Sequence, residues 1–258
     1  MDILELNKKS WDEKVKQGNP WTLPVTPEQI KKARGGMWSI VVTATRPVPA
    51  NWFPPVCGKE VLCLASGGGQ QGPVLAAAGA KVTVLDFSEA QLMQDRMVAE
   101  RENLDIRTVC ADMRDLSMFG DQQFDLIIHP VSNVYIPDVQ PVWNGAFRVL
   151  KDGGVLISGF MNPVFYLFDW DLQEEGILQV KYPIPYSDLD HLTEEQKNDQ
   201  ENGAIEFGHT LEAQIQGQME AGFYLTGFYE DTFGGERLLD QYCSSFIATR
   251  AVKPVKQQ

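Results

Sequence analysis

The chain has 258 residues, and its 22 Lys and Arg stand against 35 Asp and Glu, a net charge of −13. This acidic balance argues against nucleic acid and membrane surfaces as partners, because both present dense negative charge. We therefore expect a small-molecule partner. The four cysteines lack CxxC spacing, which predicts no metal site and favours reduced thiols in the cytoplasm. The charged start, MDILELNKKSWDEK, lacks the apolar core of a signal peptide, so export is not expected.

From residue 60 onward, short β-rich apolar runs alternate with helical stretches, a pattern typical of a parallel sheet covered on both faces. Five strands are expected, over residues 60–65, 81–86, 106–110, 124–129 and 155–160. The helices expected among them cover residues 73–79, 88–103 and 138–150. A last helix over 210–222 and two closing strands over 223–230 and 242–249 follow.

Apolar spacing predicts which face of each helix is buried. The helix that follows Asp86 begins with a capping-box pattern of Ser88 and Gln91. Its residues expected to face the sheet are Leu92, Met93 and Met97. The next helix has a stripe of Val139, Val142, Trp143, Ala146, Val149 and Leu150. In the last helix the expected stripe is Leu211, Ile215 and Met219.

Two segments fall outside this alternation. Residues 1–57 hold four of the six tryptophans, and we expect them to form an amino-terminal helical cap. Residues 161–208 are expected to form an inserted acidic and aromatic lid within a domain of residues 58–258. Between Asp169 and Glu206 there are eleven acids against Lys181 and Lys197. Two interpretations stay open: a solvated surface segment, or a lid whose acids and aromatic rings attract an amine or another cationic substrate.

A glycine loop follows the first strand. Residues 67–72, GGGQQG, satisfy GxGxxG, and Asp86 ends the next strand, so the pattern alone indicates a dinucleotide site. Glycine is needed there because a side chain would block close approach of backbone N–H groups to the ligand. Ala65 and Ser66, however, separate the strand from Gly67, and this spacing favours a wider loop.

Five segments in succession resemble motifs of the class I S-adenosylmethionine-dependent methyltransferases. They are VLCLASGGGQQG, VTVLDFSEAQL, CADMRDL, FDLIIHPV and FRVLKDGGVLISGF, and they span residues 60–160. The last two are the more specific, since a nicotinamide-binding half is not expected to contain them. The resemblance implies a doubly wound, Rossmann-like α/β fold with a seven-stranded, mostly parallel sheet and one antiparallel edge strand.

The resemblance also implies that residues 58–258 bind S-adenosylmethionine. The implied binding residues are Ala65, Ser66, Gly67, Gly69, Asp86, Phe87, Asp112, Met113 and His129. The first four would shape the loop under the methionyl part, and Asp86 would hold the ribose hydroxyls. Phe87 would stack near the adenine, Asp112 would accept from its amino group, and Met113 would offer a backbone N–H to the ring.

His129 would begin the loop that faces the methyl group, and it is the candidate base if the acceptor is a hydroxyl. The alternative is a hydrogen-bonded structural histidine. The chain departs from the family pattern at Cys63, where an acid is common, and at Ala65, where the first glycine is common. The Asn or Asp followed by two prolines and an aromatic residue, found in related amine- and amide-methylating enzymes, is absent from residues 129–135.

The function expected from the sequence is therefore methyl transfer from S-adenosylmethionine to an unidentified small molecule. Two alternatives stay open: an NAD(P)-dependent Rossmann oxidoreductase, and a noncatalytic domain that only binds S-adenosylmethionine. The sequence does not choose the acceptor atom or the oligomeric state.

Overall fold

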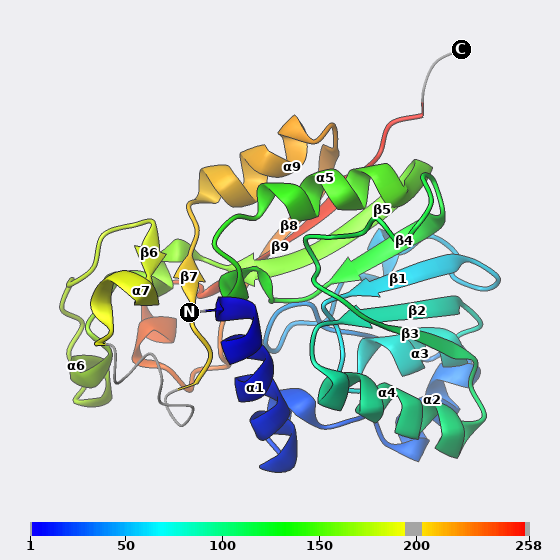
Figure 1. Cartoon of the computed structure of the whole chain (residues 1–258), viewed down its shortest axis with the longest axis horizontal. Helices are drawn as coiled ribbons and strands as arrows, with labels where there is room; N and C mark the ends of the chain where they lie inside the picture. Colours follow the sequence, from blue (N-terminus) through cyan, green and yellow to red (C-terminus); the bar gives the residue numbers. More distant parts are fainter. Residues whose placement is uncertain (1, 194–202, 256–258) are drawn as a thin grey trace.

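The computed structural model describes residues 2–193 and 203–255, whose centre is a seven-stranded sheet (Figure 1). Its strand order is β3-β2-β1-β4-β5-β9-β8. The strands are β1 (Glu60–Leu64), β2 (Lys81–Asp86), β3 (Ile106–Cys110), β4 (Phe124–His129), β5 (Leu150–Met161), β8 (Tyr224–Asp231) and β9 (Phe246–Val252). The first five run parallel, while β9 pairs antiparallel with β5 and β8 near that edge of the sheet. The expected fold class is confirmed.

Helices cover both faces of this sheet, with α3 and α4 on one side and α5 and α9 on the other (Figure 1). The α-helices are α1 (Ile3–Lys16), α2 (Pro27–Arg34), α3 (Gln71–Ala77), α4 (Glu89–Glu102), α5 (Gln140–Val149), α6 (Trp170–Glu174), α7 (Asp188–His191) and α9 (Gly217–Glu220). Short 3-10 helices cover Pro20–Thr22, Ala50–Trp52, Asn133–Tyr135, Pro163–Leu167 and Leu238–Gln241. A small second sheet pairs β6 (Tyr186–Ser187) with β7 (Phe207–Gly208). In the part of the chain described, no helix has both the length and the apolar character needed to cross a membrane.

The first 57 residues pack into the core as well as over the site. Ile40, Val42, Trp52 and Val56 are buried in the same apolar cluster as Val61 of β1, and Trp52 packs on Tyr229 of β8 with ring centres 5.3 Å apart. The backbone of this segment lies so close to β5 that a Cβ added at Gly159 would come within 1.9 Å of the Val42 carbonyl oxygen. Glycine is therefore required at that position of β5.

The predicted buried face of α4 is partly wrong. Leu92 is fully buried, but the side chains of Met93 and Met97 are 55% and 47% exposed. The face that meets the sheet instead contains Asp95 and Val98. Because Asp95 is acidic, apolar spacing could not reveal it as a buried position.

The apolar stripe of α5 is confirmed, since all six of its expected residues are buried. The stripe expected after residue 210 is wrong, because Leu211 and Met219 are more than 40% exposed. A π-helical turn over Glu212–Gln216 shifts the helix face, so that Gln214 and Gln218 are buried. The last strand also begins four residues later than expected, at Phe246.

Candidate active site

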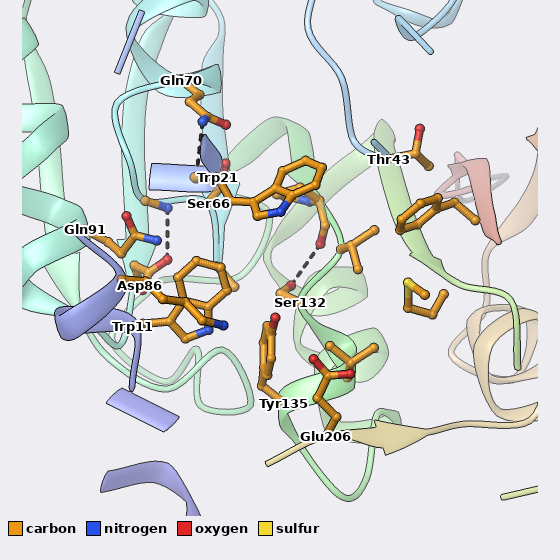
Figure 2. Close-up of a pocket in the computed structure, with 18 of the residues that line it drawn as sticks. Trp11, Trp21, Thr43, Ser66, Gln70, Asp86, Gln91, Ser132, Tyr135 and Glu206 are labelled. Atoms are coloured by element: carbon orange, nitrogen blue, oxygen red, sulfur yellow. Dashed lines mark hydrogen bonds between the residues drawn. The ribbon is translucent and has the colours of Figure 1, made fainter. Parts of the chain in front are cut away.

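A cavity of about 380 Å³ lies at the carboxyl ends of the central strands (Figure 2). It is bordered by the loops that follow β1, β2 and β4, and α1 lies beside it. The strand order reverses between β1 and β4, and ligands of open α/β sheets bind at such a point. The volume is within the range of small-molecule sites.

The glycine loop after β1 has a backbone that few side chains allow. Gly68 and Gly69 have φ angles of +108° and +72°, in the region that favours glycine. Gly67 lies against α4, where an added Cβ would approach the Gln91 Cβ to 2.7 Å. Ala65, which stands where the family commonly has its first glycine, also has a positive φ, of 46°. The loop is thus shaped so that its backbone borders the cavity closely.

Asp86 ends β2 beside this loop and is 6% exposed. One carboxylate oxygen accepts a hydrogen bond from the Gly67 N–H (2.9 Å, Figure 2), and the other accepts from the Ser88 N–H (2.9 Å). Burial raises the pKa of Asp86 to about 6, although these N–H groups favour the ionised form. Asp86 therefore fixes the loop and presents a polar group to the cavity.

Asp95 is a second buried acid of the glycine loop, and the sequence interpretation missed it. Its Oδ2 accepts a hydrogen bond from the Gly68 N–H (3.1 Å), while Oδ1 has no partner among the described residues. Burial raises the pKa of Asp95 to about 8. An acid on an otherwise apolar helix face, one turn after Gln91, is the only sequence signal for this role.

Six of the nine expected cofactor residues line the cavity: Ala65, Ser66, Gly67, Asp86, Phe87 and Met113. The other three lie outside its lining. Gly69 packs against Pro24 and the backbone of Gln94. The Asp112 carboxylate forms a bidentate pair with the Arg114 guanidinium, with an Nε–Oδ2 distance of 2.9 Å.

His129 has the geometry of a hydrogen-bonded structural histidine, not that of a base facing the cavity. Its ring is fully buried, with Nδ1 3.0 Å from the Leu64 carbonyl oxygen and Nε2 2.8 Å from the Asn133 side-chain oxygen. It packs edge-on against Trp143, and burial lowers its pKa. Asn133 in turn donates to Gln214, so this network joins β4 to the helix before β8. The structure directs His129 away from the cavity because both of its ring nitrogens are engaged in the interior.

The outer part of the cavity is built by segments far apart in sequence. The lining residues of this part are Trp11 and Lys14 from α1, Phe165 and Tyr166 from the lid (residues 161–208), Phe233 and Arg237 from the segment between β8 and β9, and Phe246 from the start of β9. Asn7 fixes α1 there, since its side-chain amide donates to the carbonyls of Tyr135 (3.1 Å) and Ile205 (3.0 Å). The Ile205 N–H donates back to Asn7 at 2.7 Å.

Two opposite charges border this outer part. The Lys14 ammonium lies 4.4 Å from the ring centre of Trp11, and burial lowers its pKa. Glu206, near Tyr135 in Figure 2, accepts a hydrogen bond from the Tyr166 hydroxyl at 2.8 Å. Burial raises the pKa of Glu206, and Lys14 acts in the opposite direction.

The other lid acids that the structure describes do not line the cavity. Asp169 pairs with Lys181 (2.6 Å), and Asp188 accepts from the Tyr186 hydroxyl and the Glu206 N–H. Of residues 169–193 and 203–206, Glu206 alone borders the cavity. The part of the predicted lid that covers 194–202, with four of its acids and Lys197, lies outside the described residues.

Comparisons with known proteins show the family of the chain. A family described as "Methyltransferase domain" matches residues 62–158. The chain is 57% identical, over 97% of its length and 98% of the relative, to "Uncharacterized methyltransferase YbaJ" of Bacillus subtilis (strain 168). It is 31% identical to a "Ubiquinone biosynthesis O-methyltransferase" of Pseudomonas fluorescens (strain Pf0-1), over 47% of this chain and 55% of that protein.

Solved structures show the same fold. An S-adenosylmethionine-dependent methyltransferase from Mesorhizobium loti superposes with a TM-score of 0.61 at 18% identity, covering 78% of this chain and 94% of that one. One from Listeria monocytogenes, titled putative, gives 0.59 at 19%, covering 81% and 95%. The 57% identity to a methyltransferase over nearly the full length decides against the NAD(P)-dependent oxidoreductase that the glycine pattern allowed. The chain belongs to the class I S-adenosylmethionine-dependent methyltransferases.

Proposed function

We propose that this cavity binds S-adenosylmethionine and a small-molecule methyl acceptor side by side. Asp86 holds the ribose hydroxyls, and Ala65, Ser66 and Gly67 lie under the methionyl part. The main support is the position of Asp86, a buried acid that borders the cavity next to a loop whose Gly67 has no room for a side chain. The fit is supported further by Gln91, which lines the same wall with a buried side-chain oxygen that lacks a partner in the described chain.

At the adenine end we propose that Phe87 stacks on the ring and that Met113 donates its backbone N–H to it. For Asp112 to accept from the adenine amino group, it must share its carboxylate with Arg114. Gly69 supports the loop from below, against Pro24. His129 has a structural role in this proposal, and no protein base is assigned.

Methyl transfer needs the acceptor atom aligned behind the methyl group in a dry site, and residues 1–57 and the lid provide the cover. When bound, S-adenosylmethionine supplies an electrophilic methyl group. The similarity to ubiquinone biosynthesis O-methyltransferases makes hydroxyl compounds the first acceptors to screen. We also propose a cytoplasmic location, cofactor binding by residues 58–258 on a core that the cap of residues 1–57 completes, and no nucleic-acid partner. Four cysteines without a disulfide and the acidic charge support the first and last of these.

The first test is calorimetric titration with S-adenosylmethionine, S-adenosylhomocysteine, NAD and NADP. Only S-adenosylmethionine and S-adenosylhomocysteine should bind. Asp86→Ala should weaken their binding about tenfold or more, because it removes a charged acceptor that contributes roughly 1.5–3 kcal/mol. Asp115→Ala is the matched control, since that exposed acid lies outside the cavity lining. Unchanged affinity of Asp86→Ala would remove the ribose role, and selective binding of NAD or NADP would contradict the whole proposal.

A further inference from the structure

The charges that border the outer part of the cavity favour an anion. Apart from Asp86, the charged residues of the lining are Lys14, Arg237 and Glu206. The outer part of the lining thus contains two cations and one carboxylate. The Arg237 guanidinium lies 5.4 Å from the ring centre of Phe233. An amine acceptor would therefore meet net repulsion here, whereas an acidic oxygen would meet attraction.

Lys14 is available to such an oxygen. Its ammonium is held over the rings of Trp11 (4.4 Å) and Tyr135 (6.0 Å), and it forms no hydrogen bond or ion pair with the residues described. The charge of Glu206 raises the pKa of Lys14, but the Glu206 carboxylate accepts its hydrogen bond from the Tyr166 hydroxyl. A partly buried ammonium without an oxygen ligand gains most from a ligand that brings one.

Tyr135 provides a second donor on the same wall. Figure 2 shows its hydroxyl directed into the cavity, and within residues 2–193 and 203–255 this hydroxyl has no hydrogen-bond partner. The Tyr135 ring packs edge-on against Trp11, with ring centres 5.5 Å apart, so its position is fixed by α1. Two donors, one charged and one neutral, thus line the same cavity.

The walls around these donors are apolar and aromatic. Phe165 and Phe246 both contact the Phe233 ring, with ring centres 5.6 Å and 4.5 Å away, and Met161 and Val134 complete the surface. Such a surface fits a flat apolar ring.

We propose that this protein methylates an acidic hydroxyl on an apolar ring, with Lys14 and Tyr135 holding the acceptor oxygen as its anion. The inference rests on the proposed function and names the acceptor class for it. The hydroxyl proton leaves to solvent when the acceptor binds. The anionic oxygen then forms a bond to the methyl carbon as the carbon–sulfur bond breaks, and that electron pair passes to sulfur, which becomes a neutral thioether.

The test measures binding of 4-nitrophenol to the protein saturated with S-adenosylhomocysteine, with 4-nitroanisole as the neutral analogue and 4-nitrobenzylamine as the cationic one. At neutral pH, 4-nitrophenol should bind about tenfold more tightly than 4-nitroanisole, the change expected for one charge-assisted hydrogen bond. Its visible spectrum should shift toward the phenolate form on binding. Lys14→Met should abolish both effects and Tyr135→Phe should reduce them, while affinity for S-adenosylhomocysteine stays as in the wild type.

Lys9→Met is the matched control, because Lys9 is an exposed lysine of the same helix and should behave as the wild type. If the wild type does not bind S-adenosylhomocysteine, the proposed function fails. If it does, but 4-nitrophenol shows no preference over 4-nitroanisole or Lys14→Met keeps that preference, the acceptor inference is overturned. Preference for 4-nitrobenzylamine overturns it too. A loss of S-adenosylhomocysteine affinity in Lys14→Met also overturns it, because that result would assign Lys14 to the carboxylate of S-adenosylhomocysteine.

Discussion

The backbone conformation of Ala65 is set by the loop that follows β1. Its φ of 46° lies in the left-handed region, which costs a residue with a side chain roughly 1 kcal/mol or more. The family commonly places glycine there, and the geometry explains why. In this chain the remaining turns of the loop use glycine at Gly68 and Gly69, and alanine, the smallest side chain, fills the first position.

Asp95 gives a pH-dependent prediction at the same scale. Its pKa is raised from the ordinary 3.8 to about 8, so the folded protein keeps a proton that the unfolded chain has already lost between those values. The free energy of unfolding should therefore fall as pH rises from about 4 to about 8. Asp95→Asn keeps an acceptor for the Gly68 N–H and cannot ionise, so its stability should fall less over this range. Urea unfolding at several pH values measures the difference, and parallel curves for the two proteins would contradict it.

At the scale of the elements, α1 is attached to the rest of the protein by the buried side chain of Asn7. The Asn7 amide makes three hydrogen bonds to the backbone of Tyr135 and Ile205, and it is 1% exposed. Asn7→Ala would leave these buried groups unpaired, at a cost of roughly 2 kcal/mol or more. The variant should also bind 4-nitrophenol more weakly when it is saturated with S-adenosylhomocysteine, because Lys14 and Tyr135 lose their support.

Urea unfolding and hydrogen exchange of α1 amides measure the effect of Asn7→Ala. Lys9→Ala serves as the control on the same helix and should stay within ~0.5 kcal/mol of the wild type. Equal stability of Asn7→Ala and the wild type would show that α1 is held by other contacts.

For the molecule as a whole, the sheet could be predicted and the outer part of the site could not. The strands around Asp86 and His129 follow local apolar patterns, which periodicity detects. Asn7 and Ile205, by contrast, lie 198 residues apart, and no local pattern indicates that they meet. His129 was interpreted from its strand position alone, while its actual partners, Leu64 and Asn133, depend on packing. The role of Asp95 also depends on packing, because its partner, the Gly68 N–H, comes from a separate segment of the chain.

The packing of residues 1–57 predicts that the remainder does not fold alone. This segment contributes six buried side chains to the apolar cluster that contains Val61 and Leu75: Ala33, Ile40, Val42, Val48, Trp52 and Val56. At roughly 1.5–3 kcal/mol for each of the larger ones, their sum is as large as a typical net stability of about 5–15 kcal/mol. A fragment of residues 58–258 should lose the cooperative thermal transition that the full chain shows by circular dichroism. A cooperative transition in the fragment would establish residues 1–57 as a separable cap.

The attachment of α1 also has a consequence for the order in which the molecule assembles. Its anchor points, Tyr135 and Ile205, follow Asn7 by 128 and 198 residues. The entropic cost of closing such a long loop is only slightly larger than for a short loop, because it grows with the logarithm of loop length. Contacts between such distant residues do, however, slow folding. During synthesis the hydrogen bonds of Asn7 therefore cannot be completed until Ile205 has been made, although α1 also contacts α4 through the Ser88–Asp12 hydrogen bond. The wall that we assign to the acceptor is consequently complete only after Phe246 has been made, whereas Asp86 and Asp95, which bind the glycine loop, are made much earlier.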